Sequence, residues 1–314
     1  MNGWLIIDKP LGLSSAQVVG AVKRIRREAG LPKTRIGHGG TLDPLATGVL
    51  PIALGEATKL AGRMLEATKG YSFTVAFGTA TSTDDGEGEV VETSEVRPTR
   101  EAVLAALPAF TGPITQVPPI YSALKVDGQR AYALARAGED VVLPSRSVTI
   151  LSLSSSPERG GGPPKAVEGL GARASSSGEE LQEITLTAHV SKGTYIRSLA
   201  RDIALALGTV GHVTMLRRIK AGPFTLERAI SLDKLGEVAK ARALEDICLP
   251  LTAGLDDIPA LPVTPDQAGL LRQGRVLIGI AAHNGLHLAA QGDIPVALVE
   301  VSDHEVRVVR GLNL

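Results

Sequence analysis

A single carboxylate, Asp43, stands in a stretch of the chain that is suited to holding it rigidly. The stretch reads GHGGTLDPLATGVL over residues 37–50. Its glycines allow the backbone to turn sharply and to approach a ligand closely. Pro44 fixes its own φ angle and restricts Asp43, and the apolar residues that follow place the turn at the edge of a core. The stretch predicts a single carboxylate held rigidly in a half-buried pocket; an ordinary Asp-Pro turn is the alternative interpretation.

Other kinds of functional site are not indicated by the sequence. The glycine-rich stretch is not a P-loop, because no Gly-Lys-Ser/Thr follows its first glycines, and it lacks the spacing of a dinucleotide-binding fingerprint. The acidic segment 81–92 fails the spacing of a calcium loop. His283 and His287 have helical spacing, but the Asn-Gly pair between them indicates a turn, so we expect loop or strand-edge residues and no metal site. With Cys248 as its single cysteine, the chain is expected to have no intrachain disulfide framework and no cysteine-bound metal cluster.

Hydrophobic periodicity predicts the elements that position this loop. Strands are expected at 3–8, 71–77 and 184–190, and helices at 16–29, 55–67, 100–107, around Tyr132 and from Ile196 to Gly208. Residues 153–180 are rich in Ser, Gly and Pro, which predicts a disordered insertion between two strands. From about residue 254 the chain becomes β-rich, with expected strands at 276–280, 295–301 and 306–310.

The distribution of charge points to a polyanionic partner although the net charge is zero. Residues 1–70 contain ten Lys or Arg against five acids, and residues 191–220 contain six against one. Two basic segments in a neutral chain predict one basic face that binds a phosphate backbone, with solvated helix faces as the alternative. No apolar run reaches the roughly 18 residues of a membrane span, and we expect no signal peptide and a cytoplasmic location.

Several motifs in the chain are similar to those of a known family. Every fixed position of the pattern G-H-x-G-x-L-D-P-x-A-x-G-x-L is present at 37–50. Further motifs occur in the family's order: D-K-P-x-G-x-S-S (8–15), K-x-Y (69–71), Q-x-P-P-x-Y-S-A-x-K-x-x-G (116–128), S-K-G-T-Y-I-R-S (191–198) and the segment 211–218. The turn at 81–88 departs from the family's T-D-T-x-D-x-x-G in having Ser82, which we expect to affect turn packing more than chemistry. Over about residues 3–220 the chain resembles the TruB family of bacterial tRNA pseudouridine synthases.

The resemblance implies a catalytic role for three residues. Asp43 corresponds to the family's nucleophilic aspartate, Tyr71 to the tyrosine that stacks on the target uracil, and Arg197 to the arginine that pairs with the aspartate. An arginine in that place would keep the carboxylate ionised and oriented. Periodicity alone favours a core tyrosine at Tyr71. Whether Asp43 attacks C1′ or C6, or mainly stabilises charge, is left open by the sequence.

A second group of residues is implied to bind the substrate. His38 would help to extrude the base, Leu216 would pack against it, and Tyr195 would lie beneath the site. The other expected contacts are Gly39 of the glycine run, three lysines from the motifs, and an arginine that follows the motif at 116–128: Lys9, Lys125, Lys192 and Arg130. Without the resemblance, His38 is interpreted as a loop histidine bonded to backbone.

The resemblance also implies the architecture and the partners. We expect an α+β fold with a central, mainly antiparallel sheet flanked by helices. A catalytic domain would span 1–250, with the disordered insertion at 153–180 and an inserted thumb at about 118–148 that clamps the tRNA stem-loop. A small PUA-like domain would span 254–314, where seven acids against four arginines leave its part in RNA binding open. The implied partner is the T-arm stem-loop of tRNA, without a metal, a cofactor or an obligate protein partner.

The expected reaction isomerises a T-loop uridine, position 55 by tRNA convention, to pseudouridine after the base is flipped out of its stack. A non-catalytic tRNA-binding or folding factor is the main alternative. A nucleoside hydrolase that uses Asp43 is a less favoured one. The three residues Asp43, Tyr71 and Arg197 argue against binding alone, because binding RNA phosphates does not require a rigid carboxylate.

Overall fold

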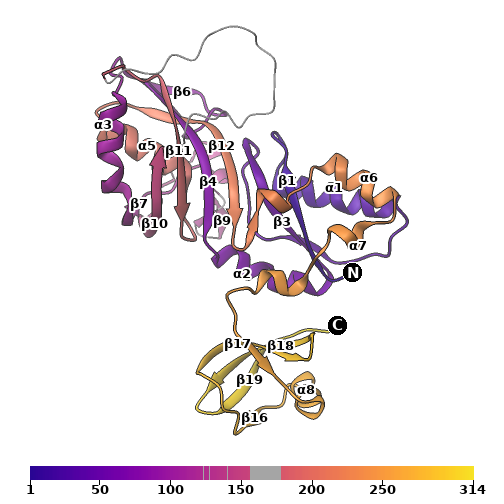
Figure 1. The fold of residues 1–314 in the computed structure, drawn as a ribbon. Coiled ribbons are helices and arrows are strands. Elements are labelled where there is room, and N and C mark those ends of the chain that lie inside the picture. The colour runs from indigo at the N-terminus through magenta and orange to yellow at the C-terminus, as the bar shows by residue number, and fades with distance from the viewer. Residues whose placement is uncertain (123, 127, 140, 156–177) are drawn as a thin grey trace. The chain divides into compact units, whose positions relative to one another are not determined.

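The computed structural model describes residues 1–122, 124–126, 128–139, 141–155 and 178–314. The fold combines helices and strands, with a large, mainly antiparallel central sheet, flanking helices and a C-terminal β domain (Figure 1). This confirms the expected α+β class. In the part of the chain that the structure describes, no helix is both long enough and apolar enough to span a membrane.

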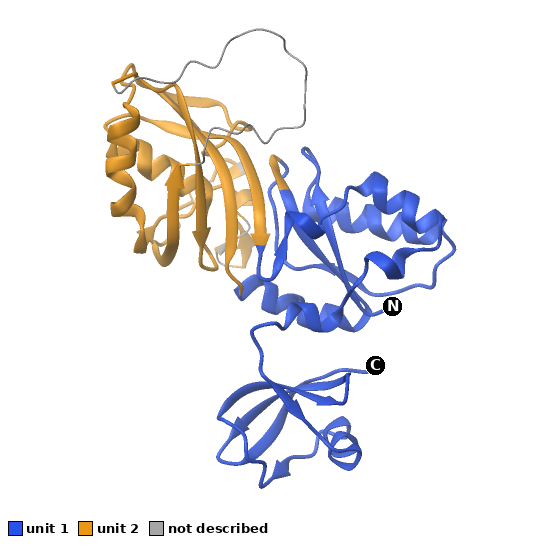
Figure 2. Cartoon of the chain, in the orientation of Figure 1, with its two compact units in different colours: residues 1–44, 48–66, 221–314 blue, residues 45–47, 67–220 orange. Residues whose placement is uncertain are grey.

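The chain forms two compact units, which we describe separately (Figure 2). The first unit consists of residues 1–44, 48–66 and 221–314, and the second of residues 45–47 and 67–220. The predicted boundary at about residues 250–254 falls inside the first unit. The division into a catalytic domain and a PUA-like domain stays a prediction.

The strands of the first unit surround β1 (Gly3–Lys9), which was expected from the sequence. β1 pairs along its length with β3 (Ala46–Leu54) and at its start with β14 (Leu249–Pro250), and β2 (Ile36–His38) pairs with the end of β3. All of these pairings are antiparallel. The buried strand β1 therefore leads directly into the turn and helix that precede the Asp43 loop.

Helix α1 (Ser15–Glu28) begins where the sequence predicts it. The Ser14 hydroxyl accepts a hydrogen bond from the Gln17 amide, and the Gln17 side chain accepts one from the Ser14 amide, which forms a capping box. The other helices of this unit outside the C-terminal β domain are η1 (Gly55–Leu60), α2 (Ala61–Glu66), η3 (Leu226–Arg228), α6 (Leu232–Lys240), α7 (Leu244–Ile247) and η4 (Leu251–Gly254), where η denotes a 3₁₀-helix.

Trp4 lies at the centre of the core of this unit. It is fully buried, its indole N–H donates to the Leu251 carbonyl (3.0 Å), and its ring lies 5.4 Å from that of Phe224. Gly254 passes so close that an added Cβ would lie 2.9 Å from the indole. The polar end of the indole is thus satisfied while its apolar surface is removed from water.

The C-terminal β domain has five strands in the order β15-β17-β18-β19-β16 and one helix. These elements are β15 (Ala260–Pro262), α8 (Pro265–Arg272), β16 (Leu277–Ile278), β17 (Gly285–Gln291), β18 (Ile294–Ser302) and β19 (Glu305–Gly311). β16, β18 and β19 match the three expected strands, whereas β15 and β17 were not predicted. His287 lies in β17, where it is buried.

The second unit contains a row of strands in the order β12-β4-β11-β10-β7, with antiparallel pairing from β4 onward. The strands are β4 (Lys69–Phe77), β7 (Gly112–Gln116), β10 (Arg146–Ser155), β11 (Glu183–Val190), β12 (Gly211–Ala221) and two hairpins, β5 (Thr79–Thr81) with β6 (Val90–Thr93) and β8 (Lys125–Val126) with β9 (Gln129–Arg130). The helices are α3 (Arg100–Ala106), η2 (Leu107–Phe110), α4 (Ala131–Arg136) and α5 (Ile196–Ala206). The short strand β13 (Phe224–Thr225) follows β12.

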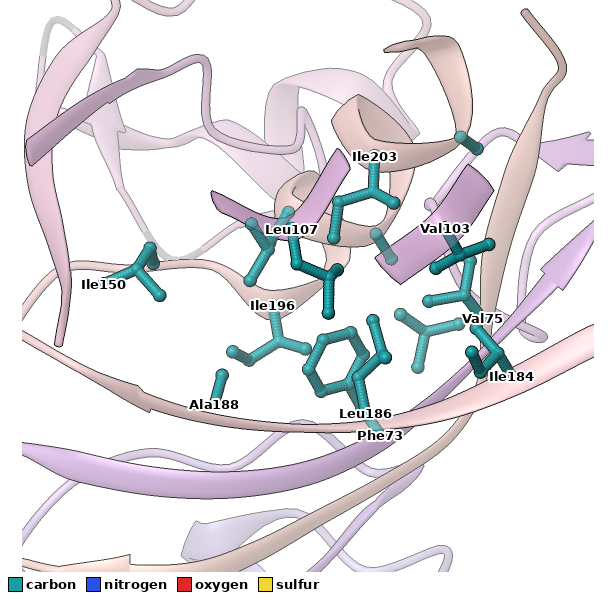
Figure 3. Packing of buried hydrophobic residues seen from close by; sticks show 14 of the residues in the cluster. Phe73, Val75, Val103, Leu107, Ile150, Ile184, Leu186, Ala188, Ile196 and Ile203 are labelled. Atoms are coloured by element: carbon teal, nitrogen blue, oxygen red, sulfur yellow. The ribbon is translucent and has the colours of Figure 1, made fainter. Parts of the chain in front are cut away.

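The core of the second unit lies between this row of strands and helix α5. Figure 3 shows Phe73, Val75 and Leu186 from the strands facing Ile196 and Ile203 of the helix. The alternation expected for β4 and β11 and the buried face expected for α5 are confirmed by the burial of their apolar residues. Because α5 packs on the sheet through this face, the position of its first turn is set by the core.

The insertion expected at 153–180 lies between two paired strands, β10 and β11. Its first residues were assigned wrongly: Leu153–Ser155 belong to β10 and pair with Leu186–Ala188 of β11. Ladder hydrogen bonds hold them although their composition is that of a loop. Residues 156–177 of the expected insertion lie outside the described residues.

Candidate active site

A buried lysine, Lys9, holds the backbone of the Asp43 loop. Lys9, at the end of β1, has no exposed surface, and its ammonium donates to the carbonyls of Pro10 (3.0 Å), Leu13 (2.5 Å) and Pro44 (3.2 Å). A buried ammonium needs such acceptors to offset its lost hydration. The Lys9 side chain thus fastens the backbone next to Asp43, and its contact with the substrate stays a prediction.

A buried serine holds the other side of the loop. The Ser15 hydroxyl accepts a hydrogen bond from the Leu42 amide (2.8 Å) and donates to the Leu42 carbonyl (3.2 Å). Gly12 N–H also donates to the Pro44 carbonyl (2.9 Å). The residues on both sides of Asp43 are thus fixed, while the Asp43 side chain is partly buried, as the sequence predicts.

The glycine run before Asp43 passes close to helix α2. Gly39 N–H donates to the Pro51 carbonyl (2.8 Å), and a Cβ at this position would lie 2.8 Å from the Met64 Cβ. Gly40 has φ +133°, a region that other residues rarely adopt. His38, the last residue of β2, is partly buried beside them. The glycines are therefore required by packing and backbone conformation, in addition to any contact with a ligand.

Tyr71 and Leu216 lie in the second unit on strands β4 and β12. Both side chains are partly buried against the core cluster of this unit and keep some exposed surface. Such a position combines a fixed ring with an accessible face, which is what a stacking residue needs. Stacking on a base stays a prediction for both.

Arg197 lies in the first turn of α5 and is buried, with 5% of its surface exposed. Its guanidinium donates to the carbonyls of Thr83 (2.9 Å) and Tyr121 (3.0 Å) and lies 3.3 Å from the Asp85 carboxylate. Asp85 is buried as well, and it accepts hydrogen bonds from the Thr83 hydroxyl (2.5 Å) and the Glu87 amide (3.0 Å). The acidic turn at 81–88 thus orients the predicted catalytic arginine.

The role of Asp85 was missed by sequence reasoning. Residues 85 and 197 are 112 positions apart, and no local pattern links them. The sequence signal that could have identified Asp85 is the fifth position of the T-D-T-x-D-x-x-G turn, which it occupies. Gly88 of the same motif has a structural reason, because a Cβ there would lie 2.6 Å from the Thr83 backbone.

Tyr195 is held by two side chains from neighbouring strands. The fully buried Gln116 carboxamide accepts from the Tyr195 amide (2.8 Å) and donates to its carbonyl (3.0 Å). The Arg146 guanidinium lies over the Tyr195 ring, 4.7 Å from its centre. Sequence reasoning missed the roles of Gln116 and Arg146, although Gln116 opens one of the motifs. Both the peptide and the ring of Tyr195 have fixed positions.

The expected phosphate contacts of the second unit lie on its loops and hairpins. Lys125 of β8 is opposite Arg130 of β9, and the Arg130 side chain is exposed. Lys192 is exposed in the loop before α5. RNA contact by these residues stays a prediction.

The basic segment near the N-terminus forms a groove of about 1130 Å³ between α1 and the loop that leads into β2. Six cationic residues line it, and none of its described lining residues is acidic: Lys23, Arg24, Arg26, Arg27, Lys33 and Arg35. Arg26 is buried and donates to the Pro32 carbonyl and the Thr34 hydroxyl, and burial lowers the pKa of its guanidinium. The other five cations are exposed. Such a groove attracts a polyanion.

The basic segment 191–220 has a different arrangement, because several of its arginines are buried or paired with carboxylates. Arg197 and Arg218 are buried, and Arg201 lies 2.9 Å from the Asp84 carboxylate and 3.0 Å from the Asp202 carboxylate. The groove described above is lined by residues of the first basic segment. The prediction of one basic face that combines both segments stays a prediction.

The expected site residues fall in both units. Asp43, His38, Gly39 and Lys9 belong to the first unit, and the remaining seven belong to the second: Tyr71, Lys125, Arg130, Lys192, Tyr195, Arg197 and Leu216. Within each unit the structure provides rigid supports for the predicted catalytic residues. The pairing of Arg197 with Asp43 stays a prediction.

Comparison with known proteins gives matches over the whole chain. The family model described as TruB family pseudouridylate synthase (N-terminal domain) matches residues 26–196, and the tRNA pseudouridylate synthase B C-terminal domain matches residues 197–256. The tRNA pseudouridine synthase B of Novosphingobium aromaticivorans is 60% identical over 314 residues, which cover 100% of this chain and 98% of the relative. The protein of the same name from Zymomonas mobilis is 54% identical over 316 residues, which cover 100% and 96%.

Two solved structures share the fold. The structure titled "Crystal Structure of a Cbf5-Nop10-Gar1 Complex" aligns with a TM-score of 0.69 and 24% identity over 99% of this chain and 84% of that one. The structure titled "Structure of H/ACA RNP bound to a substrate RNA containing 2'-deoxyuridine" aligns with a TM-score of 0.68 and 23% identity over 99% and 85%. The match of the N-terminal family model and the identity to the curated relatives show that this chain belongs to the TruB family of pseudouridylate synthases.

Proposed function

We propose that this chain converts the T-loop uridine of tRNA, position 55, to pseudouridine, with Asp43 as the catalytic carboxylate. The observation that carries the proposal is the construction of the Asp43 loop. Lys9 and Ser15 hold the backbone on both sides of a partly buried carboxylate, within a stretch that meets the family's catalytic pattern. The name of the relatives, tRNA pseudouridine synthase B, supports tRNA as the substrate.

The reaction exchanges one bond of the uridine for another. The bond between N1 and the ribose C1′ breaks, the uracil rotates, and C5 bonds to C1′. C5 then loses its proton and N1 gains one, so no atom is gained or lost by the nucleotide overall. Because the target atoms are covered in a folded T loop, the base has to be flipped out first.

The chain supplies the groups that this sequence of events needs. Asp43 provides the carboxylate, and Arg197, fixed by Asp85, is the guanidinium proposed to pair with it. Tyr71 stacks on the flipped uracil and accepts the C5 proton, and Leu216 packs against the base. His38 helps to extrude the base from its stack.

RNA binding in this proposal relies on fixed cationic surfaces. The groove along α1 binds phosphates of the tRNA, and Lys125, Arg130 and Lys192 contact the T-arm. The stretch 118–148 acts as the thumb of a catalytic domain over 1–250, and 254–314 forms a PUA-like domain.

The test uses tRNA transcripts that carry tritium at C5 of uracil. Stoichiometric release of tritium, abolished when the T-loop uridine 55 is replaced by cytidine, is the expected result. Replacement of another T-loop uridine serves as the control and should leave release unchanged.

Two other results would contradict the proposal. Tight binding of tRNA without tritium release would leave a binding or folding factor, which the basic groove alone could support. Release of free uracil into solution would identify a hydrolase, because a synthase retains the base on the RNA.

A further inference from the structure

Helix α5 carries two arginines one turn apart, Arg197 and Arg201, which project on the same side of the helix. Arg197 joins two segments of the second unit, because it donates to the carbonyl of Thr83 and to that of Tyr121. The first carbonyl belongs to the acidic turn (residues 81–88). The second belongs to the thumb-entry segment (residues 116–122).

Arg201 joins the same two segments one helical turn further on. Its Nη1 donates to the Asp84 carboxylate (2.9 Å) in the acidic turn, and its Nη2 donates to the Val117 carbonyl (3.0 Å) in the thumb-entry segment. Its Nε donates to Asp202 (3.0 Å), the next residue of the helix. All three nitrogens of the guanidinium are thus engaged, which requires the planar geometry of arginine.

The thumb-entry segment depends on such side-chain contacts. Its prolines, Pro118 and Pro119, have no N–H and make no ladder hydrogen bonds there. The Val117 carbonyl accepts a second hydrogen bond, from the Ser198 hydroxyl (2.8 Å) of α5. The first two turns of α5 therefore carry the donors that hold this segment in place.

Arg201 is surrounded by negative charge. Two carboxylates, Asp84 and Asp202, bind its single positive charge, and its side chain is 25% exposed. Burial raises the pKa of Asp84, and Arg201 opposes that rise. Asp84 also has φ +59°, a left-handed conformation that its neighbours hold in place. A cation neutralised in this way contributes little attraction for a phosphate.

We propose that Arg201 is a positioning residue. By tying the acidic turn to the thumb-entry segment, it keeps the Thr83 and Tyr121 carbonyls at the spacing that the Arg197 guanidinium bridges. Arg201 therefore acts on the reaction through Arg197, although it belongs to a basic segment that the sequence assigns to RNA binding. The proposal rests on the proposed function for its assay.

The first experiment replaces Arg201 by methionine and by lysine. Single-turnover tritium release from saturating enzyme is expected to fall about 10- to 100-fold for Arg201→Met, because a displacement of about 1 Å in a catalytic group costs this much. Arg201→Lys keeps the positive charge but loses the planar guanidinium with its several donors. Its single-turnover rate is expected to be much closer to that of Arg201→Met than to that of the wild type. The affinity for tRNA and its dependence on salt should remain those of the wild type.

Arg27→Met, in the exposed lining of the groove, is the matched control for a lost phosphate contact. It should lower the affinity and reduce the slope of log affinity against log salt by about 1. Arg201→Met would be a phosphate contact, and the proposal wrong, if it behaved like this control. An unchanged rate in Arg201→Met would also overturn the proposal.

A second pair of variants at Asp84 keeps the proposal testable if the Arg201 variants do not fold. Asp84→Asn keeps an oxygen that accepts from Arg201 and tolerates the left-handed backbone, so it should retain most of the rate. Asp84→Ala removes the acceptor and should show the same rate defect as Arg201→Met. Equal rates for the two Asp84 variants would contradict the proposal. If the wild type itself releases no tritium, the proposed function is wrong. The rates of the Arg201 and Asp84 variants test the positioning role separately, because they are compared with an active wild type.

Discussion

At the scale of single residues, the proposed catalytic carboxylate of Asp43 depends on neighbouring side chains that hold its backbone. Lys9 binds three carbonyls, and one of them belongs to Pro44, which follows Asp43. Ser15 binds both backbone groups of Leu42, which precedes Asp43. The loop is therefore preorganised before a substrate arrives, and no ordering of its backbone has to be completed during the reaction.

Variants of two adjacent serines distinguish a loss of loop rigidity, which should lower the reaction rate, from a loss of fold stability alone. Ser15→Ala leaves the Leu42 N–H buried without its partner, which should cost about 1–3 kcal/mol of unfolding free energy and lower the single-turnover rate. Ser14→Ala removes only the cap of α1 and should cost about 1 kcal/mol without affecting the rate. Chemical denaturation and tritium release measure the two quantities. Equal rates in the two variants would show that the Ser15 contact does not matter for catalysis.

At the scale of elements, helix α1 presents the cationic residues of the first basic segment along one groove. Its apolar residues Val18 and Val22 are buried, and Lys23, Arg24 and Arg27 remain exposed along the groove. Arg26, in contrast, is used to fix the loop at Pro32 and Thr34, which forms the opposite wall. Helix α1 thus supplies four of the six cations of the groove and, through Arg26, fixes the shape of the opposite wall.

The groove predicts additive salt effects. Arg27→Met and Lys33→Met should each lower tRNA affinity and reduce the salt slope by about 1, and the double variant by about 2. Lys240→Met, at the exposed end of α6, is the control and should leave the slope unchanged. The measurement is tRNA binding between low and moderate salt. Equal slopes in the wild type and the double variant would show that RNA does not occupy the groove.

Much of this local structure could be predicted from the sequence, because capping and periodicity act over a few residues. Helix α1, the alternating strands β4 and β11, and helix α5 up to Gly208 are examples. The Arg197–Asp85 and Lys9–Pro44 contacts could not be predicted in the same way, because they join residues that only the tertiary fold brings together. For the same reason, the total charge of the segment 191–220 did not reveal that Arg197 and Arg218 are buried and that Arg201 is paired with two carboxylates. Strand β17 was missed because its Ala and Gly residues give little strand signal.

At the scale of the whole molecule, the end of the chain fastens the C-terminal β domain to η1. Glu56 of η1 accepts a hydrogen bond from the Asn313 amide (2.7 Å), and Lys59 donates to the Gly311 carbonyl (2.9 Å). Leu312, between them, is buried in the cluster that contains Leu60. Two hydrogen bonds and an apolar contact thus connect residues 311–313 to η1 within the first unit.

The charge of Glu56 makes this contact sensitive to pH. Burial acts to raise the pKa of Glu56, but the hydrogen bonds from Lys59 and Asn313 and the charges of Lys59 and Arg35 outweigh it, so the pKa lies below its usual value. A lowered carboxyl pKa stabilises the fold above the unfolded pKa of about 4.3, and this stabilisation is lost as the pH falls through the folded value.

We therefore expect Glu56→Gln to be less stable than the wild type at pH 7 and the difference to shrink below about pH 4. Thermal unfolding measured from pH 7 to pH 3 checks this, with Glu237→Gln on the exposed face of α6 as the control. A stability difference that is constant over this range would show that the Glu56 charge does not contribute.

The catalytic role of the Asp43 carboxylate is tested by comparing the wild type with Asp43→Asn on tRNA labelled with tritium at C5 of uracil. Asparagine keeps the size of the side chain and removes the carboxylate. If Asp43 is the catalytic carboxylate, the variant should keep a tRNA affinity near that of the wild type and lose single-turnover release by at least about a thousandfold. Asp233→Asn, at the exposed start of α6, should release tritium normally. Release by Asp43→Asn at a rate near that of the wild type would contradict the account, because the rigid loop would then present a carboxylate that the reaction does not use.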